Sequence, residues 1–150
     1  MTQPGQQIRT YASFRFTVEV AGLTQAVFAE CSGLSGTTET HEFKEGGLNG
    51  YSHKLPGRTT FSNITLKRGM TESIDLWKWY QDIVSKKDKS SALKDVSIVQ
   101  YKPDFTEVYR WNLTKAFPVK WSGPSFTSSS SSESVETLEL AFADIQLVKR

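Results

Sequence analysis

The stretch from residue 54 to residue 87 constrains the fold more than any other, because a strand pattern passes there into a helix pattern. Apolar and polar side chains alternate through residues 62–67, and a period of two predicts a strand with one solvated face. The side chains expected on the wetter face are Asn63, Thr65 and Lys67. Ahead of this strand, residues 54–58 predict a rigid turn, since Pro56 fixes its own φ and Gly57 permits a positive φ.

A helix is predicted from about residue 73 to about residue 87. At 100° per residue its apolar side chains gather on one side, and charged or amide side chains fill the other. The apolar side comprises Leu76, Trp77, Trp79, Tyr80, Ile83 and Val84. This aromatic stripe is typical of a helix packed on a sheet, because a cofactor site would also need converging polar groups.

Alternation also predicts strands on both sides of the helix. The segments are 14–20, 25–31, 37–43, 96–101, 107–113, 117–121 and 135–147. We expect the first two to pair as a hairpin, and we expect 37–43 to lie at an edge or to leave the domain body. A change of parity indicates a bulge near residues 143–144, and Pro118 indicates an edge or another bulge. The predicted class is mainly β, an antiparallel β-sandwich or barrel with one flanking α-helix and a long extended loop.

The 150 residues suggest a single domain with three unusual segments. Residues 1–10 are polar and predict a flexible N-terminal segment. The five serines of 128–132 predict a solvated hairpin tip. Residues 44–57 are rich in glycine and poor in apolar side chains. Such a segment is either a mobile surface loop or a segment that lies across a neighbouring subunit, since long loops in compact domains usually have a task.

The sequence offers no positive case for an enzyme, a metal site or a cofactor. Cys31 is the only cysteine, and His41 and His53 are the only histidines; none of them has the spacing of a known site. The net charge of +2 is too small to indicate nucleic-acid binding, and the adjacent cations Lys67 and Arg68 are expected to be solvated. We also expect no signal peptide and no membrane anchor, and therefore synthesis and assembly in the cytoplasm.

Several motifs in order resemble those of phage-type tail tube proteins. These proteins build the inner tube of contractile phage tails and of phage-like contractile injection systems. The hallmark is residues 54–58 followed by residues 63–69, and further similar stretches are 14–22, 28–34, 41–47, 111–121 and 135–140. The resemblance covers nearly the whole chain and departs from the family only in the serine run, where a more varied loop is expected.

The resemblance implies hexameric rings that stack into a hollow tube, with hairpins of all subunits joined into one inner barrel. It implies a sheath, baseplate or spike proteins and a tail terminator as partners, with effector protein or phage DNA as cargo in the lumen. The particle stays in the cell or is released. The long loop would then join subunits or rings through Lys44, Glu45, Gly46, Gly47, Leu48, Asn49, Gly50, Tyr51, Lys54, Leu55, Pro56, Gly57 and Arg58.

A wet channel needs a polar wall, and two sets of side chains are candidates for it. Mixed charge on one face of the strand 14–20 suits water better than a dry interface. The expected lumen-facing residues are Arg15, Thr17, Glu19, Asn63, Thr65 and Lys67. The sequence leaves open whether the particle is a phage tail or an injection system. Two other classes also remain open: a monomeric carbohydrate-binding or ligand-binding β-sandwich with a Tyr109, Trp111 and Trp121 platform, and an enzyme using Cys31.

Overall fold

The structure is a computed structural model that describes residues 11–21, 28–43, 53–85 and 89–149. The described chain is mostly strand, with one α-helix and one short 3-10 helix. The strands are β1 (Phe16–Val20), β2 (Glu30–Ser32), β3 (Gly36–Phe43), β4 (His53–Phe61), β5 (Ile64–Gly69), β6 (Lys94–Tyr101), β7 (Glu107–Ser122), β8 (Val135–Ala141) and β9 (Asp144–Lys149). The helix α1 spans Asp75–Ser85, and the 3-10 helix spans Lys89–Ala92.

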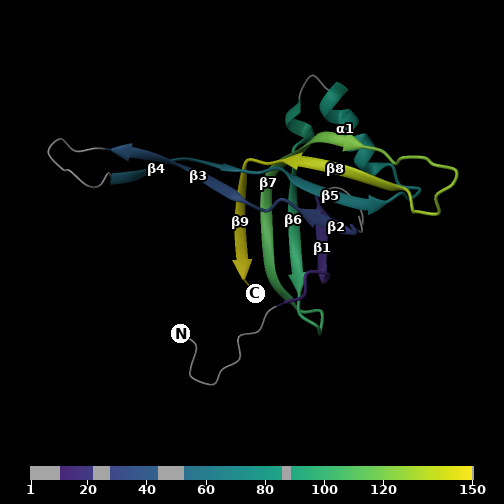
Figure 1. The fold of residues 1–150 in the computed structure, drawn as a ribbon, viewed down its shortest axis with the longest axis horizontal. Helices are drawn as coiled ribbons and strands as arrows, with labels where there is room; N and C mark the ends of the chain where they lie inside the picture. The colour runs from purple at the N-terminus through teal and green to yellow at the C-terminus, as the bar shows by residue number, and fades with distance from the viewer. Residues whose placement is uncertain (1–10, 22–27, 44–52, 86–88, 150) are drawn as a thin grey trace.

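The long strand β7 belongs to two antiparallel sheets. Its first part pairs with β6 and β9 and, with β1 beyond β6, forms what we call sheet A. Its last part pairs with β8, and the order continues through β5 to β2 as sheet B. The chain bends between the two parts at Lys115, which has a φ of 52°. The strands of sheet A therefore run across those of sheet B, and α1 lies beside them (Figure 1).

The core lies between the two sheets and the helix. Sheet B contributes Ile64, Leu66, Leu138 and Leu140, and sheet A contributes Val18, Val20, Val96, Ile98 and Leu113. Because side chains alternate across a strand, the other face of each strand points away from this core, although on sheet A that face also buries Val99 and Val108. Phe14 is an exception, since it precedes β1 and is 71% exposed instead of sharing the buried face.

Helix α1 lies inside the predicted range and packs through its aromatic stripe. The buried Trp79 donates a hydrogen bond from its indole Nε1 to the carbonyl of Ala92, at 2.7 Å. Trp77 meets Trp121 of β7 edge-on, with ring centroids 4.8 Å apart. The Ser73 hydroxyl accepts a hydrogen bond from the Asp75 backbone N–H at 3.4 Å and so caps the first turn. Leu76 and Trp79 are buried in the core and Trp77 contacts β7, so this part of the stripe packs against the sheet, whereas Val84 is 65% exposed.

Three predicted connections are wrong or incomplete. Within the described residues, the strands predicted at 14–20 and 25–31 do not pair with each other, because β1 pairs with β6 and β2 pairs with β5. The predicted strands 107–113 and 117–121 are one strand, and its register shift between Pro118 and Lys120 is the bulge that Pro118 indicated. The bulge expected at 143–144 is instead a break, after which β9 leaves β8 and crosses to sheet A. The serine run does lie at the tip of the antiparallel β7–β8 hairpin, as predicted.

Candidate assembly interface

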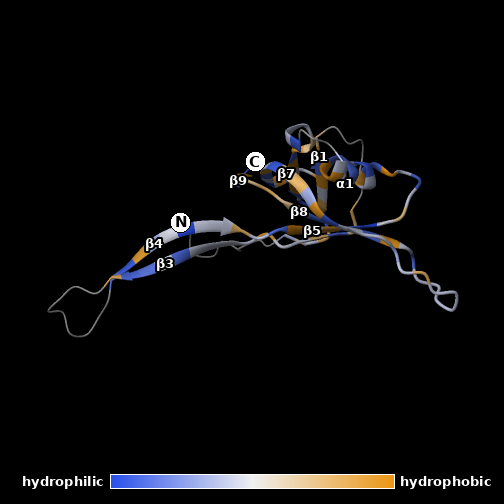
Figure 2. Cartoon of the chain, turned by 90° about the horizontal axis from the view of Figure 1, so that it is seen from above, coloured by the Kyte–Doolittle hydropathy of each residue, from blue (hydrophilic) through white to orange (hydrophobic). Residues whose placement is uncertain are grey.

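Strands β3 and β4 form a two-stranded arm that leaves the body of the molecule (Figures 1 and 2). Every residue of β3 is exposed, and β4 is exposed except at Gly57 and Phe61, which are partly covered. The arm extends the β2–β5 pair of sheet B, because β3 follows β2 and β4 runs directly into β5. Of the two alternatives predicted for 37–43, an edge strand or a strand that leaves the domain body, the structure shows the second.

The junction between arm and body is a tight crossing of two chain segments. Gly33 has a φ of +99°, and a Cβ at this position would lie 2.5 Å from the carbonyl oxygen of Asn63. Just beyond it, the Ser62 N–H donates to the Ser35 carbonyl at 3.0 Å, and the Ser35 hydroxyl donates to the Ser62 hydroxyl at 2.7 Å. The close approach requires glycine at position 33 and holds the arm as a continuation of sheet B.

Residues 54–58 do not form the predicted turn, because they lie within strand β4. Thr40 pairs with Pro56 and Thr38 pairs with Thr59, so two residues of β4 stand opposite the single residue between Thr38 and Thr40. This β-bulge accommodates Pro56, which has no N–H to give to the ladder. Gly57 keeps a negative φ, and a Cβ there would lie 2.5 Å from Nε2 of the exposed His41 side chain and 3.2 Å from the carbonyl oxygen of Glu39.

The two faces of the arm differ in character. Leu55 pairs with His41, and Phe43 pairs with His53, so these four side chains share one face. Leu55 and Phe43 are 54% and 53% exposed. The other face carries the Glu42–Lys54 pair. The arm thus holds the predicted interface residues 54–58, while the predicted residues 44–51 lie outside the described residues.

The outer face of sheet B is polar and places the predicted Asn63, Thr65 and Lys67 together. In the register of this sheet, Thr65 stands beside Ser32 and Glu139, and Lys67 stands beside Glu30 and Thr137. Asn63 Nδ2 donates to Glu139 Oε1 at 3.0 Å. Both ends of sheet B are open within the described residues, since β2 pairs only with β5 and residues 117–122 of β7 pair only with β8.

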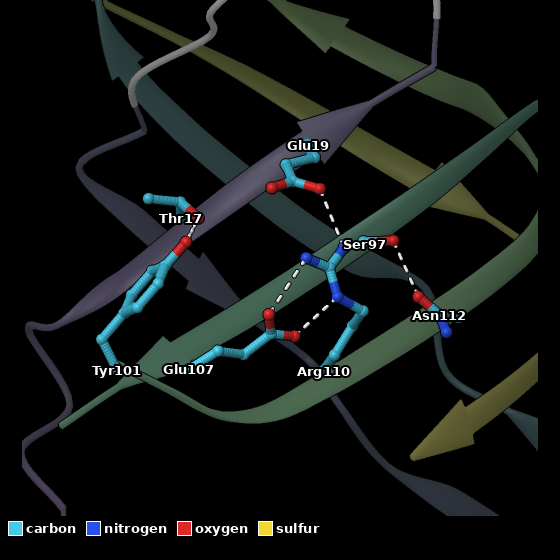
Figure 3. A network of polar contacts seen from close by, with 7 residues as sticks. All are labelled: Thr17, Glu19, Ser97, Tyr101, Glu107, Arg110 and Asn112. Carbon is cyan, nitrogen blue, oxygen red and sulfur yellow. Dashed lines mark hydrogen bonds and ion pairs between the residues drawn. The ribbon is translucent and has the colours of Figure 1, made fainter. Parts of the chain in front are cut away.

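The predicted Thr17 and Glu19 lie on the outer face of sheet A instead (Figure 3). Glu19 accepts a hydrogen bond from Arg110 Nη1 at 2.8 Å, and Glu107 accepts one from Arg110 Nε at 2.7 Å. These two carboxylates raise the pKa of the Arg110 guanidinium above its ordinary value. The Thr17 hydroxyl bonds to that of Tyr101, at 3.1 Å. The core lies between the two sheets, so the six predicted lumen residues do not share one surface.

The remaining Arg15 precedes β1, and its guanidinium carbon lies 4.4 Å from the ring centroid of Phe14. Sequence reasoning missed the acidic and basic neighbours that complete both outer faces, notably Glu139, Lys120 and Arg110. Cross-strand register brings them to these faces, and no single-strand pattern contains that information.

The candidate chemical residues are not assembled into a reactive site. Cys31 is half-buried, and burial raises the pKa of its thiol to about 11. His41 and His53 lie in the arm, and the described residues contain no cluster of His, Cys, Asp and Glu that could hold a metal ion.

Trp111 and Trp121 pack against the core, so they do not form an exposed platform with Tyr109. In the part of the chain that the structure describes, no helix is both long and apolar enough to cross a membrane.

Comparison with known proteins identifies the architecture. The family model described as T4-like virus tail tube protein gp19 matches residues 12–146. The chain belongs to this tail tube family. It is a structural tube subunit and a component of phage tail-like particles. A search of curated proteins found no match.

Solved structures similar to this tube protein come from contractile injection systems. One is described as an extracellular contractile injection system, PVC sheath–tube complex in the extended state: identity is 27%, coverage 94% of this chain and 93% of that chain, and TM-score 0.81. Another is the anti-feeding prophage cap, described as the AFP tube terminating cap: identity is 26%, coverage 100% of both chains, and TM-score 0.83. Hcp1 from Flavobacterium johnsoniae shares the fold at 19% identity, with coverage of 91% and 97% and a TM-score of 0.55.

Proposed function

We propose that this tube protein assembles into hexameric rings that stack into a hollow tube, with sheet B of each copy forming the channel wall. The observation that carries the proposal is the pair of open edges of sheet B. Neighbouring strands from β7 through β8 and β5 to β2 are all antiparallel. In a rotationally symmetric ring, β2 of one copy would therefore meet β7 of the next in antiparallel orientation. Closing the ring in this way removes both exposed edges.

The outer face of sheet B then lines the channel. Its side chains Asn63, Thr65 and Lys67 are joined by serine, threonine and carboxylate neighbours on the adjacent strands. A face of this composition remains hydrated and suits a water-filled lumen. The face that carries Thr17 and Glu19 belongs to sheet A, on the other side of the core, and therefore faces away from the lumen.

The arm, together with the glycine-rich residues 44–52, joins neighbouring subunits or rings. It points along the strands of sheet B and extends beyond the body on the side opposite the serine-rich hairpin tip (Figures 1 and 2). Its exposed Leu55 and Phe43 are not buried within their own subunit, and burying such side chains against a second copy is favourable. We assign the whole chain to one tail-tube domain whose arm is its assembly element.

The partners follow from the similar structures, which are described with a sheath, a baseplate and a terminating cap. We infer that this chain contacts a sheath along the tube, a baseplate or spike at one end and a terminator at the other. The assembly forms in the cytoplasm and passes macromolecular cargo. The chain itself has no catalytic role, since its cysteine is shielded and its histidines lie on an assembly arm.

Electron microscopy of the purified protein tests this proposal. We expect rings and stacked tubes with six-fold symmetry and a central channel. A preparation that contains only small monomeric particles at high protein concentration would instead support a monomeric binding module.

A further inference from the structure

The chain has two histidines, and both lie on the face of the arm that carries its exposed apolar side chains. In the register of the arm, His41 of β3 stands opposite Leu55 of β4, and Phe43 of β3 stands opposite His53 of β4. Imidazole and apolar side chains therefore alternate both along and across the two strands. A second copy that covers the apolar pair must also cover the two imidazoles.

The imidazole of His41 lies against strand β4. A Cβ at Gly57 would lie 2.5 Å from Nε2 of His41 and 2.8 Å from its Cδ2, so the ring occupies space that a larger residue at position 57 would need. Because Leu55 is two residues before Gly57 on the same strand, the ring lies beside the apolar side chains of this face. It is therefore part of the surface on which a second copy would pack.

The charged groups around the imidazoles cancel one another. Every residue of β3 is exposed, so within the described residues the charges near this face come from the arm itself. Glu39 stands opposite the bulge that contains Arg58, and Glu42 pairs with Lys54 on the other face. Residues 44–45, which follow β3 in the sequence, are a lysine and a glutamate. The arm thus supplies no surplus of negative charge that would compensate two protonated imidazoles.

We propose that the face formed by His41, Phe43, His53 and Leu55 is a pH-sensitive assembly contact, which holds tubes together at neutral pH and releases folded subunits in acid. The inference rests on the proposed function, which buries this face against a second copy. Histidine, with an ordinary pKa of about 6.5, is the side chain that gains charge as the pH falls from 8 to 5. Burying a charged group without a compensating partner is costly, whereas a neutral imidazole is buried readily.

Assembly through this face therefore releases protons and becomes less favourable as the pH falls. The size of the effect follows from the fraction of protonated imidazole in the free subunit. At pH 5.5, about one unit below the ordinary pKa of histidine, removing the proton from one imidazole should raise the lowest protein concentration at which tubes form by about tenfold. Removing it from both should raise that concentration by about 100-fold.

Tube formation by a variant without histidine tests the inference. The lowest concentration that gives tubes is measured by sedimentation and negative-stain microscopy at pH 7.5 and at pH 5.5. For the wild type it should rise at least about tenfold at the lower pH. For His41→Gln with His53→Gln it should change by less than about threefold, because no side chain with an ordinary pKa between 5 and 8 remains. The matched control, Glu42→Gln with Lys54→Gln, places two glutamines on the other face and should keep the wild-type pH dependence.

A second measurement needs no variant. Diethyl pyrocarbonate acylates accessible neutral imidazoles, so assembled tubes at pH 7.5 should react at least about tenfold more slowly than subunits kept below the concentration for assembly. Circular dichroism of the subunits at pH 5.5 should show the same folded spectrum as at pH 7.5, since both histidines are exposed in the single subunit.

Several results would overturn the inference while leaving the ring intact. They are wild-type tubes that form equally well at both pH values, a histidine-free variant as sensitive to acid as the wild type, equal acylation of tubes and subunits, and acid-released subunits that are unfolded. Absence of tubes from the wild type at pH 7.5 would instead refute the proposed function itself.

Discussion

Arg68 and Glu136 form an ion pair inside the protein, with side chains only 5% and 3% exposed. Arg68 Nε donates to Glu136 Oε1, and Arg68 Nη2 donates to the Ser73 carbonyl at 3.3 Å. Trp121 Nε1 donates to Glu136 Oε2, also at 3.3 Å. The pair therefore connects β5 and β8 with the last part of β7 and with the start of α1. Arg68 is not the solvated cation that the sequence suggested.

Replacing one partner of this ion pair should destabilise the protein far more than replacing both partners with apolar side chains. Glu136→Leu leaves a buried guanidinium without its counter-ion and should lower the free energy of unfolding by about 3 kcal/mol. The double variant Arg68→Met with Glu136→Leu should recover most of that loss, because apolar replacement of both partners is often neutral. Urea denaturation at one protein concentration measures both. A double variant no more stable than Glu136→Leu would contradict this reasoning.

The exposed pair Glu30–Lys67 provides the comparison. Its side chains are 57% and 45% exposed, so Glu30→Gln should change the free energy of unfolding by less than about 1 kcal/mol. A loss equal to that of Glu136→Leu would mean that burial does not distinguish the two pairs.

The arm should be needed for assembly and not for folding. Leu55→Ser changes a side chain that is 54% exposed and should shift the free energy of unfolding by less than about 0.5 kcal/mol. Tube formation should nevertheless be lost, because the substitution removes apolar surface that a second copy covers. Phe105→Ser is the control, since Phe105 is 78% exposed in the β6–β7 connection of sheet A. Tubes of normal length from Leu55→Ser would refute an assembly role for this face of the arm.

Gly33 should be the least replaceable glycine of the arm junction. An alanine there must adopt a φ of +99° and approach the Asn63 carbonyl, so Gly33→Ala should cost about 2 kcal/mol. Gly69→Ala is a suitable control, because the nearest atom to its new Cβ is 3.9 Å away. Denaturation curves that show equal stability for the two variants would be inconsistent with the tight crossing.

Cys31 should react slowly and should make stability depend on alkaline pH. Burial raises the pKa of its thiol from 9.0 to about 11, so the folded protein keeps a proton that the unfolded chain releases. The free energy of unfolding should therefore fall as the pH rises from 9.0 towards 11, and this part of the fall should be absent from Cys31→Ser. Alkylation at pH 8 should be slower in the folded protein than in urea. Equal rates would show an accessible thiolate.

Strand and helix identities were largely predictable, because they depend on local periodicity. The stripe of α1 and the alternation of β5 are examples, and the family resemblance supplied the architecture. Which strands pair with each other was not predictable. The sequence favoured a hairpin of β1 and β2, whereas the structure pairs β1 with β6 and β2 with β5. The burial of Arg68 also depends on a residue far away in sequence, Glu136, and the bulge at Gly57 depends on the register in which β4 pairs with β3.

Cross-linking between copies tests the central claim, closure of the ring through sheet B, most directly. In a Cys31→Ser background, Ser32→Cys on β2 and Ser122→Cys on β7 place one thiol at each open edge, on the same face. The control pair, Thr17→Cys with Gln146→Cys, places thiols on the outer strands β1 and β9 of sheet A. We predict that a short bis-maleimide applied to assembled tubes gives a covalent ladder ending at the hexamer for the sheet B pair and none for the control. Covalent oligomers from the control pair alone would show that sheet A closes the ring and would contradict the claim.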